Sequence, residues 1–349
     1  MTEENENISQ RKKDHIELCL TDSVAFKKKT NGLELYEFEH FAITEIKIDE
    51  IDLSTKFFGE KINFPFMISC MTGGTKEAAN INAQLAEAAA ALNIPVGVGS
   101  QKQALENDTY HSTYKIIREK AASVPVLGNL GAAQIIQLKN DHDKIRKLID
   151  LIEADAFVVH INPLQELIQK GGEPDFSGLL KALEKIIKNI KIPVIAKEVG
   201  AGISKPAARR LLEVGVRGID IAGAGGTSWA GVELLRNKEN PDNPFWDWGL
   251  PTSYCIREVK KLKKNYYFTL IASGGISTGE EVAKAIALGA DMAAAARPLL
   301  QTVVEKGVSG VYELIHSWFD TVKRIMYLTG CTNIKDLNKI KLIRKEELY

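Results

Sequence analysis

Apolar runs alternate with amphipathic stretches along the chain from Ile62 onwards. The apolar runs are nearly continuously hydrophobic, as strands of a parallel sheet are when both faces of the sheet are buried. The stretches between them carry apolar residues at helical spacing. We expect eight strands, at Phe66–Cys70, Pro95–Val98, Pro125–Leu127, Ala156–Ile161, Pro193–Lys197, Gly218–Ala222, Thr269–Ser273 and Met292–Ala296.

Seven helices are expected between these strands, at Glu77–Leu92, Thr109–Ala121, Lys144–Ile152, Phe176–Asn189, Pro206–Glu213, Ser253–Lys264 and Glu280–Leu288. Eight strands separated by seven helices fit a closed barrel better than an open, doubly wound sheet. An open dinucleotide-binding sheet would also need a Gly-x-Gly-x-x-Gly turn after its first strand, and Met71–Gly74 does not supply it. The sequence therefore predicts an α/β chain folded as a (β/α)8 (TIM) barrel.

Segments outside the repeating pattern frame this barrel. Residues 1–15 are polar and charged, and we expect them to be mobile, with a helix following at Ile16–Phe26. We divide the chain into an N-terminal extension, residues 1–60, and a barrel, residues 61–349, which carries a last amphipathic helix at 308–328.

The spacing breaks once, after the sixth strand, where a long segment separates Ala222 from Ser253. It carries Trp229, Trp246 and Trp248 among glycines and prolines. Loops of this length often cover a binding site. An aromatic lid over a planar or apolar ligand is one interpretation, and an insertion that packs a helix is the other.

Composition narrows the possible partners. The 45 basic and 45 acidic residues cancel, so no overall field favours nucleic acid or an anionic membrane. No apolar run approaches the roughly 20 residues that span a bilayer, and the N-terminus lacks a signal core. The four cysteines show no Cys-x-x-Cys spacing, which argues against zinc and against a disulfide framework. We expect a reduced, cytoplasmic protein without nucleic-acid or membrane partners.

A glycine turn follows the seventh strand at Gly274–Gly275. Thr278 and Glu281 have the spacing of a capping box at the start of the next helix, which should stop at Gly289. Backbone N–H groups at such a turn and helix start bind anions, and the last two loops of a barrel often hold phosphate. A phosphate-bearing cofactor is therefore one hypothesis, and a tight turn without a ligand is the alternative.

Polar residues recur at the carboxyl ends of successive predicted strands, where barrels carry their catalytic groups. The side chains in question are Thr72, Ser100, Asn129, Asn162, Gln165, Lys197 and Thr227. Because these ends meet at one face of a barrel, we expect the side chains to share one site.

Lys197 ends a strand that should be buried, and a buried lysine is costly unless it is paired or functional. It could form a Schiff base with a carbonyl substrate. Its charge could instead face N1 and the C2 carbonyl of a flavin. A structural ion pair with Glu198 or Asp220 is the third possibility. The polar donors on neighbouring strands favour the flavin.

Glu166 is a candidate Mg²⁺ ligand, since Mg²⁺ commonly takes one or two carboxylates and completes its shell with water and phosphate. A phosphorylated substrate would also give a purpose to Arg11, Lys12 and His15, which could pair with phosphate oxygens. Otherwise these three residues belong to a solvated charge run. His40 has no local partner pattern and is interpreted as structural.

The combination of motifs resembles type 2 isopentenyl-diphosphate isomerases over most of the chain, from Arg11 to about Leu328. The motifs are Arg11-Lys-Lys-Asp-His15, Met71-Thr-Gly-Gly74, Val98-Gly-Ser-Gln101, Asn129-Leu-Gly131, His160-Ile-Asn-Pro-Leu-Gln-Glu166, Lys197-Glu-Val-Gly200, Gly225-Gly-Thr227 and Ala272-Ser-Gly-Gly275. The most specific are the Arg-Lys-x-x-His arm and the Asn-x-x-Gln-Glu run.

This resemblance implies an FMN-dependent barrel that interconverts isopentenyl and dimethylallyl diphosphate with Mg²⁺ and reduced FMN. NADPH is the usual reductant, and members commonly assemble as tetramers or octamers. Residues matching the FMN site are Cys70, Met71, Thr72, Ser100, Asn129, Lys197 and Thr227, with Gly274, Gly275, Ile276, Ala296 and Arg297 at its phosphate end. Arg11, Lys12, His15, Asn162 and Gln165 resemble substrate contacts, Glu166 the Mg²⁺ ligand, and Gln165, Glu166 and Lys197 the residues at the reacting centre.

A 1,3-proton shift needs one proton delivered and another removed. No pair of free carboxylates stands at the predicted strand ends, so the reduced flavin is the expected acid–base agent. Gln165 and Glu166 would assist it, and Trp229 would help to exclude water. Two rivals use the same barrel: a flavin-dependent 2-hydroxy-acid oxidase, whose strand-end histidine is missing from Gly223–Thr227, and an aldolase acting through Lys197.

Overall fold

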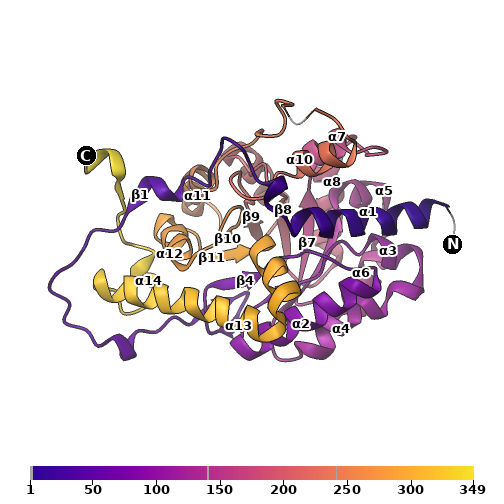
Figure 1. Cartoon of the computed structure of the whole chain (residues 1–349). Helices are drawn as coiled ribbons and strands as arrows, with labels where there is room; N and C mark the ends of the chain where they lie inside the picture. The colour runs from indigo at the N-terminus through magenta and orange to yellow at the C-terminus, as the bar shows by residue number, and fades with distance from the viewer. Residues whose placement is uncertain (1–2, 140, 241) are drawn as a thin grey trace.

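Eight parallel strands close into a barrel in the computed structural model, which describes residues 3–139, 141–240 and 242–349, with side chains from residue 10 (Figure 1). The strands follow one another in chain order, and the last pairs with the first. They are β4 Phe66–Ile68, β5 Val96–Gly97, β6 Val126–Gly131, β7 Ala156–Ile161, β8 Val194–Glu198, β9 Gly218–Asp220, β10 Thr269–Ala272 and β11 Met292–Ala295. The predicted (β/α)8 barrel is confirmed, and β6 is longer than expected.

Helices cover the outside of the barrel close to the predicted positions (Figure 1). They are α2 Lys76–Leu92, α4 Ser112–Lys120, α6 His142–Leu151, α8 Leu179–Asn189, α9 Lys205–Glu213, α11 Thr252–Val259, α12 Gly279–Leu288 and α13 Arg297–Leu328. The capping box of α12 and its stop at Gly289 are present as predicted. Helix α13 begins before the predicted residue 308 and is interrupted at Gly307, whose φ is +65°.

Five shorter helices were not expected: α3 Lys102–Glu106, α5 Ala132–Gln137, α7 Pro163–Ile168, α10 Trp229–Arg236 and α14 Ile334–Leu337. The longest of them has eight residues. Segments this short contain about two turns or fewer, so apolar periodicity cannot distinguish them from loops.

A hairpin closes the N-terminal end of the barrel. Its strands are β2 Thr55–Phe57 and β3 Glu60–Ile62. Phe57 and Ile62 have almost no exposed surface, and they join the interior cluster that contains Met67, Leu127, Ala156, Val158, Ile195, Ile271, Met292 and Ala294. The half of the barrel next to this hairpin is therefore a packed apolar core, which leaves the carboxyl ends of the strands for a site.

The N-terminal segment corrects two expectations. Helix α1 spans Glu3–Cys19, so residues 3–15 form a helix where none was expected, and the helix predicted at Ile16–Phe26 ends early. Residues 1–2 lie outside the described residues. The face of α1 that packs against the rest of the molecule carries Arg11, Lys12, His15, Ile16 and Cys19, one side of a helix. Three of these five are polar, which is why apolar spacing did not reveal the helix.

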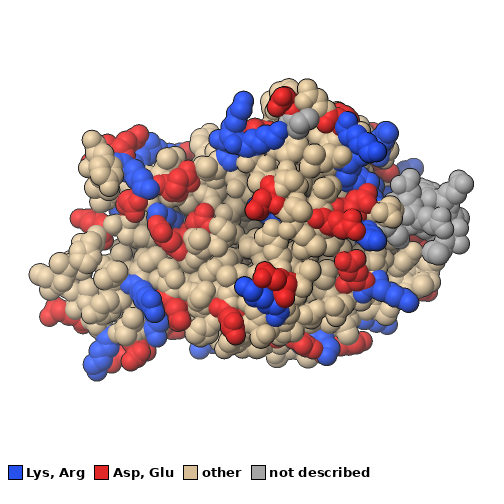
Figure 2. All heavy atoms as spheres, in the orientation of Figure 1, with Lys and Arg blue, Asp and Glu red and all other residues tan. Residues whose placement is uncertain are grey.

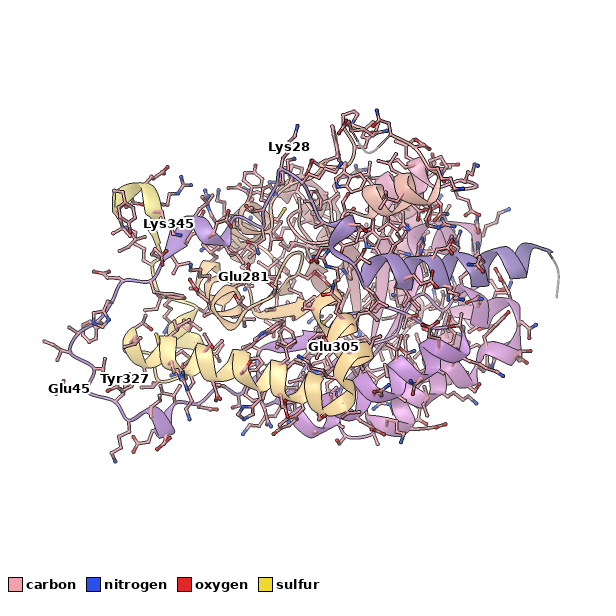
Figure 3. The ribbon with its side chains drawn as sticks, in the orientation of Figure 1. Lys28, Glu45, Glu281, Glu305, Tyr327 and Lys345 are labelled. Carbon is pink, nitrogen blue, oxygen red and sulfur yellow. The ribbon has the colours of Figure 1, made fainter. Side chains whose placement is uncertain are left out.

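The N-terminal extension also pairs with the C-terminal segment, whereas the two termini lie on opposite sides of the molecule (Figure 1). Strand β1 (Tyr36–Glu37) pairs with β12 (Ile343–Arg344) in an antiparallel sheet. The following segment passes the end of α13, where the Phe41 N–H donates to the Leu328 carbonyl over 2.9 Å. Glu45 and Tyr327 mark this end of the molecule in Figure 3.

The surface and the thiols agree with the composition. Basic and acidic side chains intermingle over the face shown in Figure 2. The four cysteines are free thiols, three of them buried. Among the described residues, no helix combines the length and apolarity needed to cross a bilayer.

Candidate active site

A cavity of about 400 Å³ lies at the carboxyl ends of the barrel strands, with α1 along one side. It brings together every side chain that the sequence singled out as a site residue. These are Arg11, Lys12, His15, Cys70, Met71, Thr72, Ser100, Asn129, Asn162, Gln165, Glu166, Lys197, Thr227, Gly274, Gly275, Ile276, Ala296 and Arg297. One shared site is therefore present, and the individual roles stay predictions.

The glycine turn after β10 forms one end of the cavity. Gly274 and Gly275 have φ values of +99° and +77°, in the left-handed region that glycine adopts without strain. A Cβ on Gly275 would also lie 2.7 Å from the Gly225 carbonyl oxygen, so no side chain fits there.

Arg297 also lines the cavity, and one of its donor nitrogens has no hydrogen-bond partner among the described residues. Its Nη1 is buried without a hydrogen-bond partner among the described residues, while its Nη2 lies 3.7 Å from Asp22 Oδ1. A buried, unsatisfied guanidinium N–H is costly, and a phosphate oxygen would satisfy it. This end of the cavity therefore fits a phosphate.

Lys197 projects from β8 into the middle of the cavity. Its Nζ donates to the Glu198 carbonyl oxygen at 2.8 Å and lies 3.6 Å from Asp220 Oδ2. Asp220 Oδ1 in turn accepts from Ser273 Oγ at 2.5 Å. Of the two ion-pair partners considered, Asp220 is the one present. A carboxylate and a carbonyl oxygen therefore hold the Lys197 side chain in place, an arrangement that favours the electrostatic role over a Schiff base.

The Glu198 carboxylate binds backbone N–H groups and does not line the cavity. Its Oε2 accepts N–H bonds from four successive residues, Val199, Gly200, Ala201 and Gly202. The carboxylate therefore shapes the loop after β8, which carries part of the cavity wall.

His160, on β7, also lines the cavity, although the sequence analysis gave it no role. Its Nδ1 lies 2.9 Å from Asn129 Oδ1. The amide nitrogen of Asn129 donates to the Val98 carbonyl at 3.2 Å, so its oxygen must accept and His160 Nδ1 must carry the proton. Burial and the charge of Lys197 lower the pKa of His160 to about 4. The ring is therefore neutral near neutral pH.

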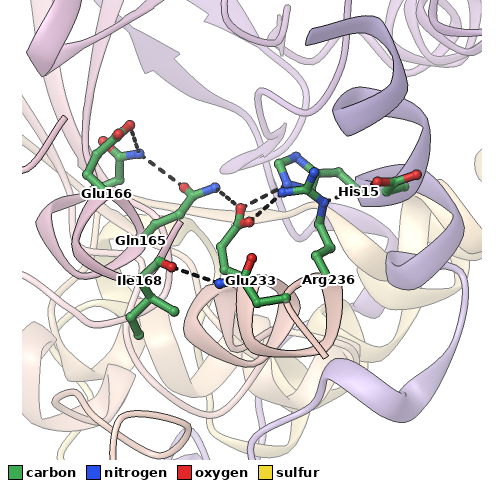
Figure 4. A network of polar contacts seen from close by, with 9 residues as sticks. His15, Gln165, Glu166, Ile168, Glu233 and Arg236 are labelled. Atoms are coloured by element: carbon green, nitrogen blue, oxygen red, sulfur yellow. Dashed lines mark hydrogen bonds and ion pairs between the residues drawn. The ribbon is translucent and has the colours of Figure 1, made fainter. Parts of the chain in front are cut away.

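The extension and the barrel meet in a network of polar contacts around Glu233, a residue of α10 that the sequence analysis missed (Figure 4). Glu233 is completely buried. Its Oε1 lies 2.9 Å from His15 Nε2 and accepts from Gln165 Nε2 at 3.0 Å. Its Oε2 accepts from Arg236 Nη1 at 2.7 Å, and Arg236 Nε reaches Asp14 at 3.3 Å. Two substrate-site candidates, His15 and Gln165, are therefore positioned by one carboxylate.

The charge on Glu233 is maintained by its partners. Burial opposes ionisation, but the hydrogen bonds from His15, Gln165 and Arg236 outweigh it and lower the pKa of Glu233 to about 2. Burial also lowers the pKa of His15 below its ordinary value, against the raising effect of Glu233. Near neutral pH a neutral His15 therefore donates its Nε2–H to the carboxylate.

Lys12 is enclosed by oxygens at the mouth of the cavity. Its Nζ donates to the Gly73 carbonyl at 2.5 Å and to Tyr114 Oη at 3.1 Å. Burial, helped by the neighbouring charge of Arg11, lowers the pKa of Lys12 to about 7. An anionic ligand beside Lys12 would therefore draw a proton onto it.

Glu166 lies in the first turn of α7 and lines the cavity, where its carboxylate has two hydrogen-bond donors. Its Oε1 accepts from Asn162 Nδ2 at 3.1 Å, and its Oε2 accepts from the Glu173 N–H at 2.9 Å. Within residues 3–139, 141–240 and 242–349, no three His, Cys, Asp or Glu side chains gather as a metal site. Mg²⁺ therefore fits here only if a phosphorylated substrate supplies further oxygens.

The aromatic lid expected from the insertion is only partly correct. Trp229 lines the cavity and meets His15 edge-to-face at 5.0 Å. Trp246 is instead 2% exposed and donates to the Ala25 carbonyl, away from the cavity. Trp248 is 59% exposed. Trp246 packs against Gly231 of α10, so it fits the helix-packing interpretation, whereas Trp229 fits the lid and the exposed Trp248 fits neither.

The barrel, the glycine turn that fits a phosphate, and Lys197 in the cavity together indicate a (β/α)8 barrel of the flavin-binding type. In agreement, residues 4–111 and 158–344 match the model of the FMN-dependent dehydrogenase family. Mandelate oxidase superposes with a TM-score of 0.65 at 16% identity, covering 97% of this chain and 98% of that one. A flavocytochrome b2 mutant with pyruvate bound superposes with a TM-score of 0.70 at 20% identity, covering 93% and 79%. These structures share the fold.

Relatives in sequence identify the family to which this barrel belongs. An isopentenyl-diphosphate delta-isomerase of Chlorobium limicola is 44% identical over 359 residues, covering 99% of both chains. Proteins of the same name from Pyrococcus abyssi and Nostoc are 44% and 43% identical, covering 95% and 96% of this chain and 91% and 96% of theirs. The chain belongs to the type 2 isopentenyl-diphosphate isomerase family, and it is an enzyme of the isomerase class.

The pH dependence of stability tests the charge on Glu233. A carboxylate whose folded pKa lies near 2, below its ordinary value of 4.5, adds stability that is present above pH 4.5 and is lost as pH falls towards 2. Between about pH 4.5 and 3, the wild-type free energy of unfolding should fall by about 1 kcal/mol per pH unit more than that of Glu233→Gln. Urea unfolding measures both. Glu305→Gln, at an exposed site, should follow the wild type; parallel curves for Glu233→Gln would contradict the assignment.

Proposed function

We propose that this enzyme interconverts isopentenyl and dimethylallyl diphosphate by a 1,3-proton shift, with reduced FMN, Mg²⁺ and NADPH as reductant. One observation carries the proposal. A single cavity is lined by the glycine turn at Gly275 with Arg297 and by two basic side chains of α1, Arg11 and Lys12. The first group suits the phosphate of a cofactor, and the second suits the diphosphate of a substrate.

The cavity residues that would hold FMN fall into two groups. Gly274, Gly275, Ile276, Ala296 and Arg297 would bind its phosphate. Cys70, Met71, Thr72, Ser100, Asn129, Lys197 and Thr227 would surround its ring system. When bound and reduced, FMN would supply the acid–base group for the proton shift. Lys197 would contribute a fixed positive charge beside the ring, held in place by Asp220.

A second group of cavity residues would hold the substrate. Arg11 and Lys12 would pair with diphosphate oxygens, and Glu166 would be the carboxylate ligand of a Mg²⁺ ion that offsets the diphosphate charge. Asn162 donates to both Gln165 Oε1 and Glu166 Oε1, at 3.0 and 3.1 Å, so it would keep the two side chains in register.

The hydrocarbon end of the substrate would lie beside Gln165. Gln165 Nε2 donates a hydrogen bond to the buried Glu233 carboxylate, which fixes the orientation of the Gln165 amide. In this proposal Gln165 and Glu166 assist proton movement, while His15 and Trp229 shield the reacting carbons from water.

The wider assignments follow from the same proposal. Residues 1–60 would act as an extension carrying the substrate arm, and residues 61–349 as the FMN-binding barrel. We propose a cytoplasmic homo-oligomer, a tetramer or octamer, without nucleic-acid or membrane partners.

Direct turnover tests the function. Incubation of the purified protein with isopentenyl diphosphate, Mg²⁺, FMN and NADPH should produce dimethylallyl diphosphate, measured by NMR, without stoichiometric loss of NADPH. The protein should carry a yellow flavin or accept one on reconstitution. A colourless protein that takes up no FMN, or one that instead oxidises 2-hydroxy acids, would reject the proposal.

Substitution of Glu166 tests the metal assignment. Glu166→Gln removes the anionic ligand but keeps the side-chain shape, so the Mg²⁺ concentration for half-maximal activity should rise roughly tenfold or more. Glu173→Gln is the matched control, because Glu173 also lines the cavity but its carboxylate accepts from Gln137 at 2.5 Å. A rise in the control and none in Glu166→Gln would move the ligand to Glu173.

Proton uptake on binding tests Lys12. With a pKa of about 7 in the free protein, Lys12 is mostly neutral near pH 8, and a diphosphate beside it restores its charge. Binding of isopentenyl diphosphate to the oxidised enzyme should then take up close to one proton, measured by calorimetry in buffers of different ionisation enthalpy. Lys12→Gln should abolish this uptake. Lys13→Gln, whose side chain is 57% exposed on the same helix, should preserve it.

A further inference from the structure

The N-terminal extension passes directly behind the glycine turn after β10. Gly225, in the loop after β9, has a φ of +119°, and a Cβ there would lie 2.0 Å from Asn31 N. A Cβ on Gly275 would lie 3.1 Å from Asn31 Cβ. Three segments distant in sequence therefore pack backbone against backbone, with Asn31 only 4% exposed between them.

The Asn31 side chain uses both of its amide protons on the cavity loop. Nδ2 donates to the Gly275 carbonyl oxygen at 2.8 Å and to Glu281 Oε1 at 2.6 Å. Its Oδ1 accepts from the Leu33 N–H at 2.9 Å, and its own carbonyl accepts from the Ser253 N–H at 2.9 Å. The amide is fully satisfied and rigidly oriented.

Glu281, near the start of α12 in Figure 3, extends this connection along the loop. Its other oxygen, Oε2, accepts from the Ser277 N–H at 2.7 Å and from the Thr278 N–H at 3.1 Å. Asn31 therefore restrains the loop at two points, directly at Gly275 and through Glu281 at Ser277–Thr278.

The bond to Gly275 sets the direction of the next peptide. In a trans peptide the C=O and the following N–H point in opposite directions. Because the Gly275 carbonyl points to Asn31, the Ile276 N–H points away from Asn31, and both residues line the cavity. In the described part of the chain the N–H groups of Gly275 and Ile276 donate to no protein acceptor.

We infer that Asn31 is a positioning residue for the phosphate of the cofactor, which rests on the proposed FMN site. It holds the Gly275–Ile276 peptide so that the Ile276 N–H points away from Asn31 and is available to the anion before the cofactor arrives. The extension then has two functions: α1 carries the substrate arm, and the segment around Asn31 orders the cofactor's phosphate loop.

Comparison of FMN with riboflavin tests this inference, because the two ligands differ only by the phosphate. Each is titrated into the flavin-free full-length protein, and binding is followed by quenching of flavin fluorescence. Asn31→Ala removes both donors, so the dissociation constant for FMN should rise roughly tenfold or more while that for riboflavin changes less than about twofold. Asn31→Asp should weaken FMN binding further, because it sets a third acceptor against the Gly275 carbonyl and Glu281.

Asn338→Ala is the matched control. Asn338 Nδ2 also donates twice, to the Ile286 and Ala290 carbonyls at 2.9 and 2.8 Å, but at the far end of α12. This variant should bind both flavins as the wild type does. Thermal unfolding of each flavin-free variant checks that it is folded.

The outcomes separate the inference from the proposal beneath it. A wild-type protein that binds neither flavin overturns the FMN site itself. A wild type that prefers FMN, together with Asn31→Ala that retains this preference, overturns the role of Asn31 alone. Equal weakening of FMN and riboflavin in Asn31→Ala also overturns it, because the loss would then be general rather than confined to the phosphate.

Discussion

Buried charge at the carboxyl end of the barrel ties the N-terminal extension to the rest of the chain. Glu233 has no exposed surface, and its charge is stable only because His15, Gln165 and Arg236 donate to it. One of these donors comes from α1, one from α7 and one from α10 itself. If α1 were displaced, a buried anion would lose a partner, which costs far more than an equivalent change at the surface. The fold therefore holds α1 over the cavity even though most of its inner face is polar.

The two parts of the cavity that would bind phosphate groups differ in the kind of group that they offer. At the glycine turn the proposed phosphate site would use backbone N–H groups held by Asn31, with Arg297 contributing a long side chain whose Nη1 is buried. At the mouth, Arg11 and Lys12 are long side chains on one helix, and Lys12 has a lowered pKa. A rigid site suits a cofactor that stays bound, whereas a protonation-dependent site suits a substrate that must also leave.

Much of this arrangement could be predicted from single residues and short spacings. The glycines at 274–275 and the Thr278–Glu281 box describe one turn and one helix start, which depend on neighbours within a few residues. Lys197 could be recognised as unusual because a lysine ends a strand that should be buried. The predictions failed where a helix was short, as in α10, or where its buried face was polar, as in α1. Neither leaves an apolar periodicity to detect.

The sequence by itself determined the barrel and the set of residues that share its open end. The period of the apolar runs selects a parallel (β/α)8 architecture, and that architecture brings the carboxyl ends of all eight strands to one face. Only the tertiary structure decided which groups pair there: Asp220 rather than Glu198 with Lys197, His15 with Glu233, and Asn31 with Gly275. The reason is physical. Periodicity and turns arise from local geometry, whereas a buried polar group takes its partner from whichever segment packing brings within about 3 Å.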